Sequence, residues 1–292
     1  MNITTEQLSR DKDQFYTNSD IALACASVLR TSLDALGYVR PKIIEPSAGT
    51  GALMIAAHEV GFKRTVGLDI EPKHPAVKYA DFLEMPTPKR PARNSVIFGN
   101  PPFGNRSKLA IEFFNHSAKL ADTVAFIIPA QFRKWSVQSK LAKGMHLIVD
   151  TILPEEAFIF MGKPYAVRCV FQIWTRRRSG FEDLRITQAP PIAHADFEMH
   201  QYNNTPQAMG VFDRPWDFAV PRQGYHDYQR REVSTEDCEK TTQWILFKAR
   251  PAILKRLCKL DFDTIALGNT SVKGFGKADV VKAYNAEYGE QS

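Results

Sequence analysis

The stretch Lys42-Ile43-Ile44-Glu45-Pro46-Ser47-Ala48-Gly49-Thr50-Gly51 decides the fold class of this chain. It begins as a short apolar strand and ends in a turn whose glycines can adopt dihedral angles that other residues avoid. A helical pattern follows over 52–59. A strand, a glycine turn and a helix in this order indicate an α/β protein. The turn is either an ordinary tight connection or a loop that contacts a nucleotide-type ligand.

Strands and helices continue to alternate on both sides of this stretch. Strands are expected over 65–70, 76–80, 95–99 and 123–128, and helices over 21–36 and 108–120. The first helix has Ser19 or Asp20 as its expected N-cap and Gly37 as its stop signal. The alternation predicts a Rossmann-like α/β fold, with a parallel sheet and helices on both faces. Ligands of such sheets bind beyond the carboxyl ends of the strands.

Acidic residues follow two of these expected strands. Asp69 lies at the end of the second strand, where a carboxylate can accept hydrogen bonds from the two hydroxyls of a ribose. Asp81 and Phe82 follow the third strand, and Asp81 can accept from the exocyclic amine of an adenine. The alternatives are a solvated carboxylate at a strand end and an aspartate that supports a turn.

The most specific signal is Asn100-Pro101-Pro102-Phe103, directly after the apolar strand at 95–99. Two prolines stiffen the backbone and remove two donors, which leaves carbonyl oxygens and the Asn100 amide oxygen as acceptors. Phe103 adds a flat apolar ring. Two acceptors and a ring suit a planar base that bears an NH2 group, and the alternative is a proline-rich loop.

Taken together, these motifs resemble those of the S-adenosylmethionine-dependent N6-adenine DNA methyltransferases of phages and prokaryotes, in the γ-class order, over residues 14–175. The resemblance assigns cofactor binding to Phe15, Tyr16, Thr17, Glu45, Ser47, Gly49, Gly51, Asp69, Ile70, Asp81, Phe82 and Asn100. It assigns catalysis to Asn100, Pro101, Pro102 and Phe103, and stacking on the adenine to Phe103, Phe158 and Phe160, with Phe158 preferred over Phe160. Two positions depart from the family pattern. Asn18 replaces a usual proline, which is expected to loosen the loop over the cofactor, and Phe103 replaces the commoner tyrosine.

The resemblance implies methyl transfer from S-adenosylmethionine to the N6 amine of an adenine that has been flipped out of duplex DNA. RNA is the alternative nucleic-acid substrate, because rRNA-type relatives share the Asn-Pro-Pro-Phe motif. A protein-glutamine N5-methyltransferase and an inactive nucleic-acid-binding module are further alternatives. The family context is restriction-modification or phage.

The chain is expected to divide into a catalytic domain over 1–178 and an α+β target-recognition region over 179–292, with a boundary at the basic run 176–180. Strands are expected at 157–160 and 165–174, and a late helix around 244–260. Candidate DNA-binding residues are Arg133, Lys134, Lys140, Arg214, Arg222, Tyr225, Arg230 and Arg231. The alternatives for them are a solvated helix face and the core of a small domain.

Composition is typical of a soluble globular protein and permits a polyanionic partner. The 292 residues carry a net charge of +6, are 44% hydrophobic, and include no apolar run of membrane-spanning length. The first 20 residues lack a signal-peptide core, which favours a cytoplasmic protein without a membrane partner. The four cysteines form no CxxC pair and the histidines no HExxH motif, so neither a zinc finger nor any other metal site is expected.

Overall fold

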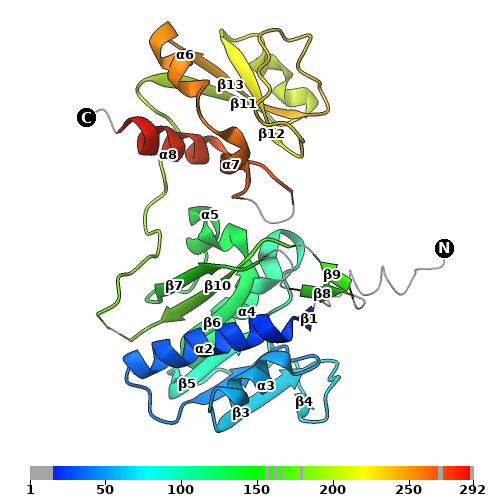
Figure 1. Cartoon of the computed structure of the whole chain (residues 1–292), viewed down its shortest axis with the longest axis vertical. Helices are drawn as coiled ribbons and strands as arrows, with labels where there is room; N and C mark the ends of the chain where they lie inside the picture. The colour runs from blue at the N-terminus through cyan, green and yellow to red at the C-terminus, as the bar shows by residue number, and fades with distance from the viewer. Residues whose placement is uncertain are drawn as a thin grey trace, which may run out of the picture. The chain divides into compact units, whose positions relative to one another are not determined.

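The computed structural model describes residues 16–154, 158–160, 163–165, 167–177, 180–268 and 272–289. At residue 16 and in the segments 158–160 and 163–165 it describes the backbone alone. The chain divides into two compact units, Met1–Thr187 and Gln188–Ser292. We call them unit 1 and unit 2 (Figure 1).

Unit 1 is built on a seven-stranded sheet in the order β4-β3-β2-β5-β6-β10-β7. The strands are β2 (Lys42–Glu45), β3 (Arg64–Asp69), β4 (Val77–Tyr79), β5 (Ala92–Gly99), β6 (Ala121–Pro129), β7 (His146–Ile152) and β10 (Cys169–Thr175). Strands β2 to β6 are parallel, and β10 runs antiparallel to both of its neighbours. The predicted Rossmann-like class is confirmed, with a mixed sheet in place of a purely parallel one.

Helices cover both faces of this sheet. Helices α2 (Ser19–Ala35) and α3 (Ala52–Glu59) pack on one face, and α4 (Lys108–Leu120) packs on the other (Figure 1). Neighbouring strand residues alternate between the two core clusters, as Ile97 and Phe98 do on β5, because successive side chains of a strand point to opposite faces. The central strands therefore read as continuous apolar runs in the sequence.

The N-cap of α2 is Asn18, and neither of the expected residues takes this position. The Asn18 side chain accepts the backbone N–H of Asp20 at 2.9 Å. Proline has no such acceptor in its side chain, so the departure from the family pattern at this position gives α2 a cap. Gly37 follows the helix with a left-handed φ of 70°, as the stop signal requires.

The expected strand at 165–174 is two strands in two different sheets. Strand β9 (Lys163–Tyr165) pairs with β8 (Phe158–Phe160), which pairs with β1 (Tyr16–Thr17) in a separate three-stranded sheet. Strand β10 begins later, at Cys169, and joins the main sheet. Local sequence contains no sign of this division, because each strand is assigned by partners that lie far away along the chain.

Unit 2 is an α+β fold with a three-stranded antiparallel sheet in the order β11-β13-β12. Its strands are β11 (Phe197–Tyr202), β12 (Phe218–Gln223) and β13 (Gln243–Ala249), and its helices are α6 (Pro251–Leu257), α7 (Phe262–Ala266) and α8 (Lys277–Tyr288). The expectation of one helix over 244–260 is wrong. The run Trp244–Phe247 is the buried central strand, and the helix starts only at Pro251, which suits a first helical position.

None of the helices in the described part of the chain combines the length and apolar character that crossing a membrane requires.

Candidate functional site

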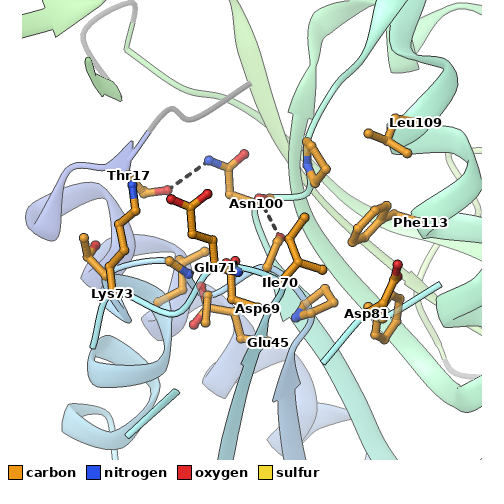
Figure 2. A pocket seen from close by; sticks show the side chains of 18 of the residues that line it. Thr17, Glu45, Asp69, Ile70, Glu71, Lys73, Asp81, Asn100, Leu109 and Phe113 are labelled. Atoms are coloured by element: carbon orange, nitrogen blue, oxygen red, sulfur yellow. Dashed lines mark hydrogen bonds between the residues drawn. The ribbon is translucent and has the colours of Figure 1, made fainter. Parts of the chain in front are cut away.

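A cavity of about 610 Å³ lies at the carboxyl edge of the main sheet, and its described lining comes from unit 1. It brings together ten of the residues that the sequence marked: Thr17, Glu45, Ser47, Gly49, Asp69, Ile70, Asp81, Phe82, Asn100 and Pro102. Figure 2 shows several of their side chains converging from separate loops. The parallel strands explain the convergence, since their carboxyl ends meet at one edge.

Other marked residues lie elsewhere. Gly51, Pro101 and Phe103 do not line the cavity. Phe15 lies outside the described residues, and so do the side chains of Tyr16, Phe158 and Phe160. The roles assigned by resemblance stay predictions for these residues and also for the ten that line the cavity.

The glycine turn is tied to strand β3 by hydrogen bonds. The Gly49 N–H donates to Asp69 Oδ2 at 2.7 Å, and the Ala48 N–H donates to the Leu68 carbonyl at 2.8 Å. Gly49 and Gly51 adopt φ values of 47° and 81°, which side chains disfavour. Gly51 serves as the N-cap of α3, which explains why it is set back from the cavity.

Asp69 is held by two backbone donors. Besides Gly49, the Glu71 N–H donates to Asp69 Oδ1 at 2.7 Å. Each carboxylate oxygen can accept a second hydrogen bond. The carboxylate is therefore fixed in orientation and can still bind hydroxyl groups in the cavity.

Glu45 is a buried carboxyl group in the cavity wall, with 4% of its surface exposed. Among the described residues, no hydrogen-bond partner reaches its Oε2 atom. Burial raises the pKa of Glu45 well above its usual value of 4.5; the Met54 backbone N–H opposes this rise, and the charge of Asp69 adds to it. A buried carboxyl with one unsatisfied oxygen fits a ligand that brings a cationic donor.

Asn100 follows β5 and is held from two sides (Figure 2). Its Nδ2 donates to Thr17 Oγ1 at 3.3 Å, and Ser47 Oγ donates to the Asn100 carbonyl at 3.0 Å. Next to it, a Cβ on Gly99 would lie 2.8 Å from Pro46 Cδ, so the two loops approach as closely as a glycine allows. These contacts place the Asn100 side chain beside the glycine turn.

Phe103 packs against the two larger core clusters of unit 1 and is half-buried. Phe82 and Phe113 form an aromatic wall of the cavity, with their rings stacked and the centroids 5.4 Å apart. Sequence reasoning missed Phe113 and Leu109 as cavity residues. The available signal was their spacing of four on one face of α4.

The β3–β4 loop adds two charged residues that were also missed, Glu71 and Lys73. Their signal in the sequence was only their position just after Asp69. The Lys73 N–H donates to the Gly49 carbonyl at 3.1 Å, which joins this loop to the glycine turn.

Three of the arginines marked for DNA binding are engaged inside unit 2. Arg222 donates to the Phe275 carbonyl at 2.9 Å and to Gln243 Oε1 at 2.6 Å. Arg230 forms ion pairs with Glu239, at 2.8 Å, and with Glu232. The Arg231 guanidinium lies 4.7 Å from the ring centroid of Phe262. These side chains stabilise unit 2, and their role in DNA binding stays a prediction.

The remaining candidates differ in exposure. Tyr225 is half-buried, stacks on His226 and is contacted by Arg230. Arg214 and Lys140 are exposed, and Lys134 is half-buried. Arg133 is exposed and pairs with Asp150 at 2.6 Å. Their contacts with DNA also stay predictions.

Within the described ranges, no cluster of three or more histidine, cysteine, aspartate or glutamate side chains is arranged to hold a metal ion.

No protein-family model matches the chain, and no curated protein matches it either. Among solved structures, a candidate RNA methyltransferase from Pyrococcus horikoshii is similar over 56% of this chain and 87% of its own, with 16% identity and a TM-score of 0.45. The methyltransferase subunit of a type I restriction-modification system from Streptococcus thermophilus is similar over 61% of this chain, with 14% identity and a TM-score of 0.42. The chain spans about half of that subunit, at 51%. A magnesium protoporphyrin IX methyltransferase from Synechocystis with bound S-adenosylmethionine is similar over 54% of this chain and 80% of its own, with 13% identity and a TM-score of 0.37.

Proposed function

We propose that this protein transfers a methyl group from S-adenosylmethionine to the N6 amine of adenine in duplex DNA. One observation carries the proposal. Four successive parallel strands each place a polar residue at or just after their carboxyl ends, and these residues line one cavity: Glu45, Asp69, Asp81 and Asn100. Their acceptor groups match the polar groups of the cofactor and an amine substrate.

The cavity fits the cofactor in size and in chemistry. Its volume of about 610 Å³ lies within the range of roughly 300–1,000 Å³ that is usual for small-molecule sites. The unsatisfied carboxyl of Glu45 suits the cofactor's ammonium group, and Asp69 suits the ribose hydroxyls. Asp81 suits the exocyclic amine of the cofactor's adenine, beside the apolar wall of Phe82 and Phe113.

S-adenosylmethionine, when bound, supplies a methyl group already activated by a positively charged sulfur. The protein's task is to hold a weakly nucleophilic amine against it. Thr17 accepts a hydrogen bond from Asn100 Nδ2, and we propose the other polar atom of this side chain, Oδ1, as the acceptor for a substrate amine. Asn100 is neutral and positions the amine, and the displaced proton leaves to water after transfer.

Duplex DNA is the proposed substrate because the chain carries a second unit. An enzyme that acts on short sites in a genome needs its own means of selecting them, since non-specific sites compete in vast excess. Unit 2, over Gln188–Ser292, supplies a separate fold for that task. RNA and protein glutamine are the competing substrates that the experiment must separate.

The test is transfer of labelled methyl from S-adenosylmethionine to plasmid DNA, duplex oligonucleotides, total RNA and a protein extract in parallel. Label is expected in duplex DNA, as N6-methyladenine after digestion. Label confined to RNA would overturn the DNA assignment, and label confined to protein would overturn the nucleic-acid assignment. The Asn100→Ala variant serves as the negative control.

A further inference from the structure

Two exposed cations follow the Asn-Pro-Pro-Phe motif, Arg106 in the turn after it and Lys108 at the first residue of α4. The turn starts at Gly104 and leads into α4, and both Gly104 and Leu109 line the cavity. Arg106 and Lys108 lie between these two residues, and both are exposed. Positive charge is thus placed within three residues of the cavity lining.

The turn has a fixed and strained backbone. Arg106 and Ser107 adopt left-handed φ values of 52° and 58°, which are uncommon for residues with side chains. Ser107 is buried, and its hydroxyl accepts a hydrogen bond from Gln131 Nε2. Strain of this kind persists only where surrounding contacts impose it, and it concentrates at functional sites.

The bond from Gln131 brings a second turn beside the first. That turn, η2 (Ala130–Arg133), follows strand β6 and continues into Lys134. We call four cations in or next to the two turns the cationic rim: Arg106, Lys108, Arg133 and Lys134. Among the described residues, Asp150 lies 2.6 Å from Arg133 and Glu112 lies 3.9 Å from Lys108.

We infer that the cationic rim binds the phosphodiester backbone of the strand whose base enters the cavity, an inference that rests on the proposed function. A flipped base keeps its sugar-phosphate at the mouth of the pocket that receives it. The phosphates on either side of that nucleotide then need cations at the mouth, and phosphate contacts of this kind set register. The N-terminus of α4 adds positive potential at the same place.

The opposite edge of the same sheet offers a matched control. Arg40 precedes β2, and Arg93 is the second residue of β5. Both therefore lie at the amino edge of the sheet, away from the cavity loops. Both are exposed, and Arg40 has a left-handed φ of 47°, close to that of Arg106. Replacing this pair changes net charge by the same amount as replacing Arg106 and Lys108.

The experiment measures binding of a short labelled DNA duplex, its single strand and an RNA hairpin as salt is raised, without cofactor. For the duplex, each lost phosphate contact lowers the slope of log affinity against log salt by roughly 0.9. Arg106→Ala/Lys108→Ala should therefore lower the slope by about 1.8 on the DNA duplex. Arg40→Ala/Arg93→Ala should leave the slope at its wild-type value, and the charge-conserving Arg106→Lys/Lys108→Arg variant should retain most of it.

An unchanged slope in the rim variant, an equal loss in the amino-edge variant, or no binding of any nucleic acid by the wild type would each overturn the inference. Thermal unfolding checks that each variant is folded. If Arg106→Ala/Lys108→Ala does not fold, Arg106→Gln/Lys108→Gln takes its place. Calorimetry with S-adenosylmethionine separates the two proposals. A wild type that does not bind it overturns the proposed function, whereas the salt slopes are measured without it.

Discussion

At Glu45, folding and ligand binding favour different protonation states of the same carboxyl group. The carboxyl is buried, so its ionised form is disfavoured in the folded protein, and its pKa is raised mainly for this reason. A cationic ligand group in the cavity would favour that same ionised form. Ligand binding should therefore release a proton from Glu45 at pH values below its raised pKa.

This predicts how stability depends on pH. The folded-state pKa of Glu45 lies above the unfolded value of 4.5, so its favourable contribution is complete below that value. The contribution is lost as the pH rises from 4.5 through the folded-state pKa. Glu45→Gln removes the titration, so the wild type should lose stability relative to the variant over this interval. Denaturant unfolding of both proteins across the interval is the measurement, and parallel curves would contradict the prediction.

Replacement of Asn100 tests the catalytic role proposed for the same cavity. Asn100→Ala removes the proposed acceptor for the substrate amine, while the carboxyl groups of the cavity remain. Turnover should fall by about a hundredfold or more, with cofactor affinity within a few-fold of the wild type. Asn105→Ala is the matched control, because Asn105 is an exposed asparagine close by in sequence. Steady-state kinetics and calorimetry give the two readouts, and turnover near the wild-type level would reject the assignment.

At the scale of elements, the site depends on how closely the loop after β2 approaches the end of β5. Ser47 bonds to the Asn100 carbonyl, and Pro46 packs on Gly99 with no room for a Cβ. The hydrogen bond and the close packing set the distance between the glycine turn and the Asn-Pro-Pro-Phe loop. Neither loop would hold its position without the other.

Gly99→Ala should therefore damage both stability and binding. The added methyl would lie 2.8 Å from Pro46 Cδ, and overpacking of this kind costs about 1–3 kcal/mol. Thermal unfolding should show a lowered midpoint, and cofactor affinity should fall as the loops separate. Gly180→Ala is the control, since no atom of the described residues lies within 4 Å of a Cβ at that position. Equal stability of the two variants would show that the loops tolerate a wider spacing.

At the scale of the whole molecule, the cavity and most of the arginines marked for DNA binding lie in different units. The described cavity lining belongs to unit 1, whereas unit 2 uses several of its arginines to hold its own fold. Arg231 illustrates this use: it donates to the carbonyls of Tyr228 and Arg230 while its guanidinium covers Phe262. Loss of DNA binding after removal of such a residue would thus have two explanations: loss of a direct contact with DNA, or destabilisation of unit 2.

The two causes can be separated. Arg231→Ala should destabilise the protein by about 1–3 kcal/mol, because carbonyls lose their donor and a cation leaves an aromatic face. Arg214→Ala, at an exposed arginine of the same unit, should stay within about 0.5 kcal/mol of the wild type. Denaturant unfolding measures both variants. Unchanged stability in Arg231→Ala, together with a flatter salt dependence of DNA binding, would instead favour a direct contact with DNA.

The sequence predicted the elements whose signals are local. Helices α3 and α4 and strand β2 have the expected bounds, because glycine turns and apolar periodicity mark where such elements begin and end. The polar residues at the ends of β2, β3 and β5 could be named as one site for the same reason: in a parallel sheet, strand ends meet at one edge. Sequence by itself thus determined the fold class of unit 1 and the position of the cavity.

Tertiary structure decided what depends on partners distant along the chain. The apolar run in β13 suits a buried helix as well as a central strand, and only pairing with β11 and β12 decides between them. The unsatisfied oxygen of Glu45, the bond from Asn100 to Thr17 and the internal contacts of Arg222 likewise arise from packing between separate segments. Residue type limits what a side chain can bind, but its neighbours in space determine which of those bonds it makes.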